Sequence, residues 1–176
     1  MTRMSLKKIL LHPDPRLKKT CEPVGNIDAA MRKLADDMLE TMYDAPGVGL
    51  AAPQVGSIYR LFVMDVSGKE AEPEPRVLFN PRLSWVSDDT NTHEEGCLSI
   101  PEIYEDITRP VSVRMTFQNI DGVVHEQEFD GLGATCVQHE LDHLNGRLFI
   151  DYLSAVKRGM ITSKMKKLKK ERARDK

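Results

Sequence analysis

The sequence is poor in cysteine and in aromatic side chains, and it has no long apolar run. It has three cysteines, Cys21, Cys97 and Cys136, and aromatic residues make up only 6% of the 176 residues. So sparse and odd a set of cysteines argues against a disulfide framework and suits thiols in a reducing compartment. No stretch reaches the roughly 18 consecutive apolar residues that a transmembrane helix needs. We therefore expect no membrane span in this chain.

The first residues do not have the form of a targeting segment. The apolar patch at residues 9–11 is short, and no small-residue cleavage site follows it. We therefore expect a cytoplasmic protein without a signal or transit peptide. A mass of 19.9 kDa suits a main domain whose hydrophobic core needs no disulfide bonds.

The charges are unevenly distributed along the chain. The formal net charge is −2, but residues 164–176 contain eight Lys or Arg against two Asp or Glu, so the rest of the chain is acidic. A basic tail on an acidic body suggests a partner of its own, such as RNA, although a solvated helix end gives the same pattern. We therefore divide the chain into a single domain over residues 1–163 and a basic helical tail over residues 164–176.

Hydrophobic periodicity predicts helices and antiparallel strands in mixed order. Apolar residues recur at helical spacing over 28–43, with Asp28 as the N-cap, and alternate with polar residues over 111–117. Further strands are expected over 61–66, 77–79, 83–86 and 123–129. Two more helices are expected, one ending at Gly146 and one starting near Ser154. The predicted class is α+β, with antiparallel β-sheets packed around a central helix, plus a C-terminal helix.

The pentapeptide His139-Glu140-Leu141-Asp142-His143 is the most informative pattern in the chain. Positions i and i+4 share one face of a helix, so both imidazoles can reach one metal ion. Glu140 can then act as general acid and base on a water that the metal activates. A solvated histidine pair on a helix surface is the alternative. The pattern predicts metal-assisted hydrolysis, but it specifies neither the bond that is cut nor the remaining ligand.

A third protein ligand has to come from another part of the sequence. In peptidases with this helix, the third ligand usually follows the second histidine. Here acids are scarce after His143, and Phe149 stands where a third histidine would be. Cys136 shares the helix face, but the rise of roughly 10 Å from it to His143 is too long for both to bind one ion. We expect Cys136 to be a core or pocket-wall thiol. Cys97 is the best remaining candidate, and it would leave one tetrahedral position for water. Weaker candidates are His12, His93 and His125.

Three separated segments combine these residues with a Gly-rich stretch. They are Gly47-Val48-Gly49-Leu50-Ala51-Ala52-Pro53-Gln54, Glu95-Gly96-Cys97-Leu98-Ser99 and Gln138-His139-Glu140-Leu141-Asp142-His143. Their order and spacing resemble the three signature motifs of the peptide deformylases, and the resemblance extends over nearly the whole chain. It implies an enzyme that removes the formyl group from the N-terminal formyl-methionine of new bacterial or organellar polypeptides and releases formate. The domain over 1–163 is then the catalytic deformylase domain.

The resemblance also implies the metal chemistry. Cys97, His139 and His143 would bind one divalent ion, which in this family is typically Fe²⁺, with Zn²⁺, Ni²⁺ or Co²⁺ able to occupy the site. The ligand set alone would have predicted zinc. Metal-bound water would attack the formyl carbon, and Glu140 would pass its proton to the departing amine. Asp142 would either orient the metal ligands or be an ordinary acid on the helix surface.

The substrate contacts that the resemblance implies lie in the first two motifs. The Gln54 side-chain amide and the Leu98 backbone N–H would stabilise the oxyanion of the tetrahedral intermediate. The N-formylmethionyl peptide of a nascent chain would bind along Gly49 in an extended pose, with its methionine in a pocket partly walled by Val48.

Other functions and partners remain open at this point. A metallopeptidase with the same helix would need a carboxylate or histidine as third ligand, and a structural zinc protein would need a fourth protein ligand. The basic tail is expected to contact the ribosome, as the C-terminal helix of similar deformylases can. We expect neither a membrane nor a DNA partner, and the lack of a visible transit peptide favours a bacterial source.

Overall fold

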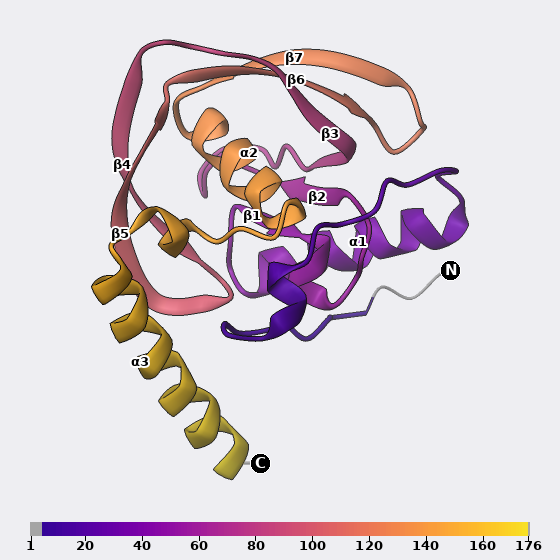
Figure 1. The fold of residues 1–176 in the computed structure, drawn as a ribbon. Helices are drawn as coiled ribbons and strands as arrows, with labels where there is room; N and C mark the ends of the chain where they lie inside the picture. Colours follow the sequence, from indigo (N-terminus) through magenta and orange to yellow (C-terminus); the bar gives the residue numbers. More distant parts are fainter. Residues whose placement is uncertain (1–4, 176) are drawn as a thin grey trace.

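Two antiparallel β-sheets surround a central helix in the structure, a computed structural model that describes residues 5–175 (Figure 1). Residues 1–4 and 176, the outer ends of the expected N-terminal segment and basic tail, lie outside the described residues. The strands are β1 (Gly49–Ala51), β2 (Leu61–Met64), β3 (Arg76–Val86), β4 (Thr90–Cys97), β5 (Ile100–Pro110), β6 (Ser112–Gln118) and β7 (Val124–Asp130). The helices are α1 (Ala29–Asp44), α2 (Gly131–Leu144) and α3 (Ala155–Arg174), with the short 3-10 helices η1 (Pro15–Lys18), η2 (Ala52–Val55) and η3 (Phe149–Tyr152). The predicted α+β class is confirmed.

The larger sheet has the order β1-β2-β3-β6-β7, and β4 pairs with β5 in a separate ribbon. Helix α1 begins after Asp28, whose side chain accepts a hydrogen bond from the Met31 N–H, as the sequence predicts. Its apolar stripe, which includes Met38 and Met42, packs on β1, β2 and β3 in one hydrophobic cluster. The stripe is therefore core packing.

Helix α2 is the central helix (Figure 1). It contacts β1 and β2 on one side and β5, β6 and β7 on others, so most of its residues are buried. Ala134, Val137 and Leu144 pack into the main core, while Glu140 and His143 are buried polar residues on the same helix. Buried polar groups need partners or a ligand, so the position of α2 already marks a functional site.

The β4–β5 ribbon is the main element that the sequence pattern did not predict. Strand β4 has mostly polar residues on both faces, so it lacks the alternation that marks a half-buried strand. It is held by its pairing with β5, which runs from Thr90 opposite Pro110 to Cys97 opposite Ile100. A register irregularity between Glu95 and Cys97 shifts the pairing just before the cysteine.

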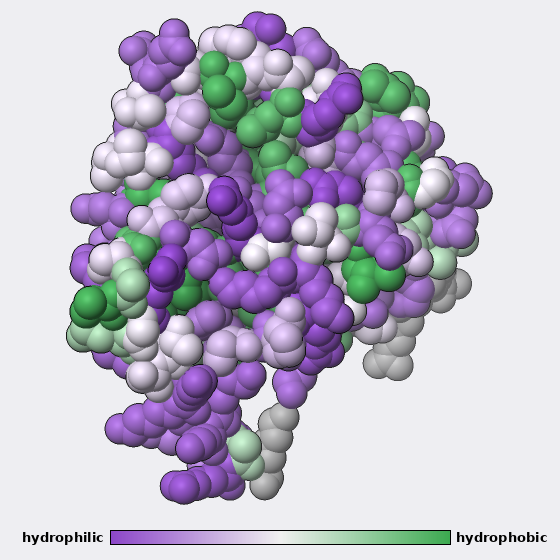
Figure 2. All heavy atoms as spheres, viewed as in Figure 1, coloured by the Kyte–Doolittle hydropathy of each residue, from purple (hydrophilic) through white to green (hydrophobic). Residues whose placement is uncertain are grey.

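Helix α3 begins after Ser154, whose hydroxyl accepts a hydrogen bond from the Lys157 N–H. It is continuous across residues 163 and 164, the expected boundary between domain and tail. Ile161 and Met165 are buried in a cluster that Leu168 also contacts, so the first part of the basic segment packs on the body. Val156 and Met160 in the first half of α3 are exposed, while the lower end of the helix is strongly hydrophilic on the face that Figure 2 shows. None of the helices in residues 5–175 has the length and apolar character needed to cross a bilayer.

Candidate metal centre and active site

Three potential metal ligands meet at the middle of the molecule. His139 and His143 project from α2, and Cys97 ends β4. Their ligand atoms all lie within 4.8 Å of one another, and the Cys97 Sγ is 3.4 Å from the His143 Nε2. In the described part of the chain, this is the group of His, Cys, Asp and Glu side chains that could hold a metal ion. The structure thus brings together the three residues that the motifs singled out.

The weaker candidates lie elsewhere. His12 hydrogen-bonds the Thr162 hydroxyl of α3 at 2.8 Å, His93 is exposed on β4, and His125 stacks on Phe117 in the larger sheet. Cys136 is buried against the main core and lines the cleft described below, as expected for a pocket-wall thiol.

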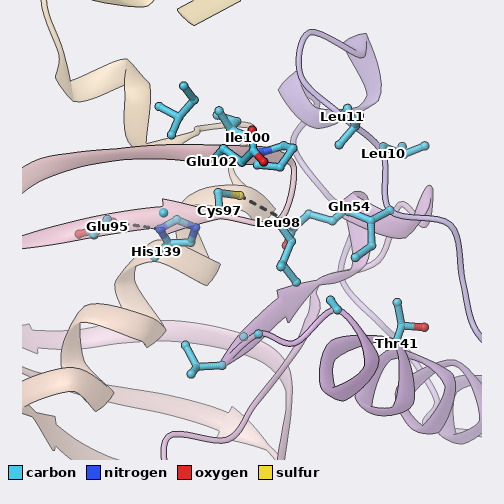
Figure 3. A pocket seen from close by; sticks show the side chains of 18 of the residues that line it. Leu10, Leu11, Thr41, Gln54, Glu95, Cys97, Leu98, Ile100, Glu102 and His139 are labelled. Atoms are coloured by element: carbon cyan, nitrogen blue, oxygen red, sulfur yellow. Dashed lines mark hydrogen bonds and ion pairs between the residues drawn. The ribbon is translucent and has the colours of Figure 1, made fainter. Parts of the chain in front are cut away.

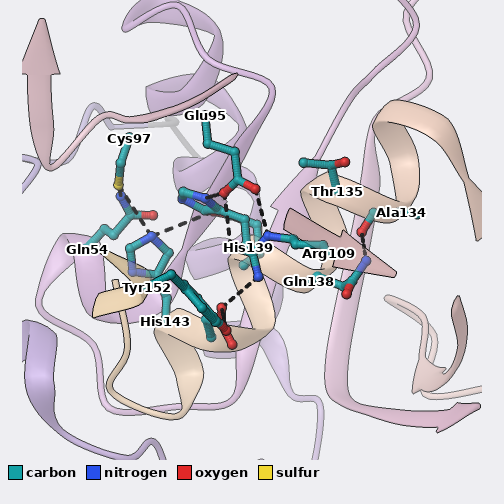
Figure 4. Close-up of polar contacts among 12 residues, drawn as sticks. Gln54, Glu95, Cys97, Arg109, Ala134, Thr135, Gln138, His139, His143 and Tyr152 are labelled. Atoms are coloured by element: carbon teal, nitrogen blue, oxygen red, sulfur yellow. Dashed lines mark hydrogen bonds and ion pairs between the residues drawn. The ribbon is translucent and has the colours of Figure 1, made fainter. Parts of the chain in front are cut away.

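His139 is held in place by a chain of charged groups (Figure 4). Its Nδ1 lies 2.9 Å from a Glu95 carboxylate oxygen, and the Arg109 guanidinium donates two hydrogen bonds to the same carboxylate, at 2.7 and 2.9 Å. A carboxylate accepts only, so the proton of the neutral His139 ring lies on Nδ1 and leaves Nε2 free to bind a metal. Partners of this kind orient the ligands of metal sites and increase their basicity.

Asp142 continues this chain toward the surface. Arg109 donates a third hydrogen bond to Asp142 at 2.9 Å, and the Tyr152 hydroxyl donates to the same oxygen at 2.8 Å. The guanidinium also lies 5.0 Å from the centre of the Tyr152 ring. Asp142 therefore acts on the histidine through Arg109 and Glu95. Sequence reasoning missed Arg109 and Tyr152, because neither lies in a motif and their partners are 10 to 33 residues away in the sequence.

Burial shifts the pKa values of the groups around the centre. Burial raises the pKa of the Glu140 carboxyl to about 7, and it lowers that of His143 well below the usual range. Burial also acts to raise the pKa of Glu95, but the hydrogen bonds from His139 and Arg109 outweigh it and lower that pKa. A neutral His143 and an ionised Glu95 are the states in which one binds a metal and the other orients a ligand.

Glu140 lies beside the ligand atoms without contacting them. Its Oε1 is 4.0 Å from the Nε2 of both His139 and His143, which is too long for a hydrogen bond. Its Oε2 is buried and has no hydrogen-bond partner among the described residues. A carboxylate at this distance can reach a water molecule between itself and the ligand atoms. A thiol, two imidazoles and an unpartnered carboxylate fit a divalent metal with an open position for water.

Gln54 lies on the other side of Cys97 with its amide in a fixed orientation. The side-chain oxygen accepts a hydrogen bond from the Ala51 N–H at 2.9 Å, so the amide nitrogen must point the opposite way. That nitrogen donates to the Ser99 hydroxyl at 3.0 Å and lies 3.4 Å from the Cys97 Sγ. The side chain is buried, and the hydrogen bonds hold a donor at the metal centre (Figure 3).

The centre opens into a cleft of about 1280 Å³. All three sequence motifs line it, through Val48, Gly49, Gln54, Cys97, Leu98, His139 and Glu140. Val48 and Leu132 are about half exposed at its rim, and Cys136 lies deeper. The cleft therefore combines an apolar wall with the polar groups of the centre.

Gly49 brings the first motif against helix α2. A Cβ at this position would lie 2.9 Å from the Cys136 Sγ and 3.0 Å from the Glu140 Cδ. We expect Gly49→Ala to displace the Glu140 carboxylate and so to lower the rate of hydrolysis at this centre, with the affinity for a divalent metal unchanged. Gly25→Ala is the matched control, because a Cβ there would meet nothing within 4 Å. Unchanged kinetics in Gly49→Ala would contradict this close packing.

The fold and the centre together define the class of metal-dependent hydrolases that carry a His-Glu-x-x-His helix. The sequence profile of the polypeptide deformylase family matches residues 6–159. A peptide deformylase of Afipia carboxidovorans is 53% identical over 167 residues, covering 95% of this chain and 98% of the relative. The chain belongs to the peptide deformylase family. It is an enzyme of the family that removes the N-formyl group from new polypeptides.

Solved structures agree with this assignment. The crystal structure of peptide deformylase from Ehrlichia chaffeensis superposes with a TM-score of 0.90 at 36% identity, covering 96% of this chain and 99% of that one. A peptide deformylase from Legionella pneumophila gives 0.89 at 43% identity, with coverage of 97% and 99%. The family is metal-dependent and acts on formylated peptides, which agrees with the candidate centre described above.

Proposed function

We propose that Cys97, His139 and His143 bind one divalent metal ion and that the enzyme hydrolyses the formyl amide of N-formylmethionyl peptides beside it. We propose Fe²⁺ as the ion, on the resemblance to the family, with Zn²⁺, Ni²⁺ or Co²⁺ able to replace it. The observation that carries the proposal is the position of the buried Glu140 carboxylate, 4.0 Å from both imidazole nitrogens. A divalent ion held by the three ligands would supply a Lewis acid that lowers the pKa of water.

Glu140 is the proposed general acid and base. Its carboxylate takes a proton from the attacking water and delivers it to the nitrogen of the departing amine. The proposal is supported by the burial of Glu140, which keeps its carboxylate away from bulk water, and by its free Oε2 atom. Release of the amine leaves formate as the other product.

Gln54 and Leu98 are the proposed oxyanion donors. The orientation of the Gln54 amide supports this role, because its nitrogen faces the centre while its oxygen bonds Ala51. Leu98 directly follows Cys97, and its side chain packs so close to Gly47 that a Cβ there would lie 2.8 Å from the Leu98 Cδ1. Two fixed donors on one side of the formyl carbon would stabilise the developing negative charge.

The substrate is proposed to bind as an added strand along Gly49. Strand β1 pairs with β2 at the end of the sheet order, so its other edge can hydrogen-bond a peptide. The methionine side chain would then enter the cleft beside Val48, where apolar groups including Cys136 lie. A formyl group is small, so a close-fitting carbonyl site can favour it over acetyl.

Formate release from formyl-Met-Ala-Ser under anaerobic conditions tests the proposal. We expect formate from this peptide, little product from acetyl-Met-Ala-Ser, and no cleavage of an internal peptide bond. Cleavage of internal bonds would support a metallopeptidase instead. Bound metal without any hydrolysis would support a structural metal protein, although the described residues offer only three clustered ligands.

The basic end of α3 is proposed to contact the ribosome, and the enzyme is proposed to act on nascent chains in the cytoplasm. The division into a catalytic domain over 1–163 and a tail over 164–176 remains part of this proposal. A truncation after residue 161 would remove the buried Met165, so reversal of exposed charges is the sharper test. We expect Lys164→Glu with Lys167→Glu to lower the salt dependence of ribosome binding by about one unit of log–log slope per lysine. Equal binding by this variant and wild type at every salt concentration would contradict the contact.

A further inference from the structure

The cleft is larger than a formyl-methionyl group requires. Its volume of about 1280 Å³ exceeds the range of roughly 300–1,000 Å³ that is typical of pockets for small ligands. Its lining includes His139 and Glu140 at the metal centre as well as Lys169, Arg172 and Ala173 in the last two turns of α3. The cleft therefore has room for several residues of the peptide after its methionine.

The N-terminal segment at residues 10–12 connects α3 to the loops of the metal centre. The Leu10 N–H donates to the Gln54 carbonyl at 2.7 Å, and the His12 N–H donates to the Ser99 carbonyl at 2.9 Å. Between these two bonds, the Leu11 carbonyl accepts a hydrogen bond from the Lys169 Nζ at 3.4 Å. The end of α3 is thus fixed to the same segment that supports the catalytic loops (Figure 3 shows Leu10, Leu11 and Gln54 on one side of the cleft).

One face of α3 changes from apolar to basic as it approaches the cleft. Residues 165, 168, 169, 172 and 173 recur at helical spacing and share this face. Met165 and Leu168 pack on the body, while Lys169 and Arg172 line the cleft. The same lysine and arginine therefore face the cleft and not the opposite, fully solvated side of the helix.

The residues of α3 that line the cleft are two bases, Lys169 and Arg172, and Ala173. Asp14 lines the N-terminal side of the cleft, and it is bound by Arg16 through two hydrogen bonds from the guanidinium, at 3.0 and 2.7 Å. Glu94 of β4 and Glu102 of β5 also line the cleft, and β5 packs against α3 through Ile100 and Ile103. The part of α3 that lines the cleft therefore contributes two positive charges and no negative one.

We infer that the last two turns of α3 form a distal subsite of the substrate cleft, in which Lys169 and Arg172 bind an acidic side chain of the formylated peptide several residues after its methionine. The inference rests on the proposed function and adds a sequence preference to it. Ion pairs at exposed sites are weak and screened by salt, so the preference is one of degree. Part of the basic segment at residues 164–176 would then bind the substrate directly.

A peptide scan tests this subsite. Hexapeptides of the form formyl-Met-Ala-Ala-Ala-Ala-Ala carry a single Asp or a single Lys at the third to sixth position in turn. Formate release gives KM and kcat for each peptide at low and at high salt. Wild type is compared with Arg172→Glu, and Lys170→Glu is the matched control, because Lys170 lies in the same turn of α3 but does not line the cleft.

At one or two positions, we expect wild type to have a KM about two- to fivefold lower for the Asp peptide than for the Lys peptide, with similar kcat. Arg172→Glu should abolish or reverse that difference, Lys170→Glu should retain it, and high salt should reduce it. The subsite is contradicted if no position distinguishes Asp from Lys, or if Lys170→Glu changes the ratio as much as Arg172→Glu does. Failure of wild type to release formate from any peptide would instead contradict the proposed function.

Discussion

Replacing Glu140 with glutamine is expected to lower kcat on formyl-Met-Ala-Ser by about 10²- to 10⁴-fold, the usual contribution of a positioned general acid and base. Glutamine keeps the size and hydrogen-bonding reach of the side chain, but it cannot take a proton from water. Because Glu140 lies 4.0 Å from the imidazole nitrogens and does not bond to them, the three ligands should keep their arrangement. Metal content should therefore equal that of wild type.

Glu102→Gln is the matched control for this experiment, because Glu102 lines the same cleft on β5, away from the ligand atoms. The control should keep most of its activity. Two results would contradict the assignment of Glu140. Near-normal hydrolysis by Glu140→Gln would remove it as general base, and loss of the metal from this variant would make it a ligand instead.

Replacing Cys97 with serine is expected to weaken metal binding strongly. The loss of affinity should exceed the roughly 10- to 100-fold that is typical when a residue that hydrogen-bonds a metal ligand is replaced. A serine hydroxyl is a poorer metal ligand than a thiolate. The Cβ–O bond of serine is also shorter than the Cβ–S bond of cysteine, so the oxygen would lie farther from the two imidazoles. Activity should fall with metal occupancy. Titration of the metal-free protein with Zn²⁺ or Co²⁺ measures the change without depending on catalysis.

Cys136→Ala is the control for Cys97→Ser. Cys136 is buried on the same helix as the histidines, but it does not belong to the cluster of ligand atoms. Its substitution should leave the metal affinity unchanged. Full metal occupancy in Cys97→Ser, or a loss in Cys136→Ala equal to that in Cys97→Ser, would overturn the ligand set.

The parts of this molecule that local sequence patterns determine could be predicted. The helix after Asp28 follows from its apolar period and its cap, and α2 follows from the position of its histidines and of Gly146. Cys97 could be predicted as the third metal ligand for two reasons. Helix geometry excludes Cys136 from that role, and few acids follow His143 in the sequence. Each of these arguments needs only neighbouring residues or the known dimensions of a helix.

The parts that depend on pairing between distant segments could not be predicted. Strand β4 is mostly polar on both faces, so only its pairing with β5 shows it to be part of a sheet. Arg109 lies 14 residues from Glu95 and 33 from Asp142, and no local pattern announces that the three side chains meet. The packing of Met165 against the body could not be predicted either, because its neighbours in sequence are mostly basic and its packing partners are distant in the sequence.

Metal content and formate release measured on the same anaerobic sample test the central claim most directly. The metal-free protein is titrated with Fe²⁺ while the initial rate on formyl-Met-Ala-Ser is recorded. We expect the rate to rise in proportion to bound metal and to reach its maximum at one ion per chain. Full activity in the metal-free protein, or a maximum that requires two ions per chain, would contradict a single metal centre formed by Cys97, His139 and His143.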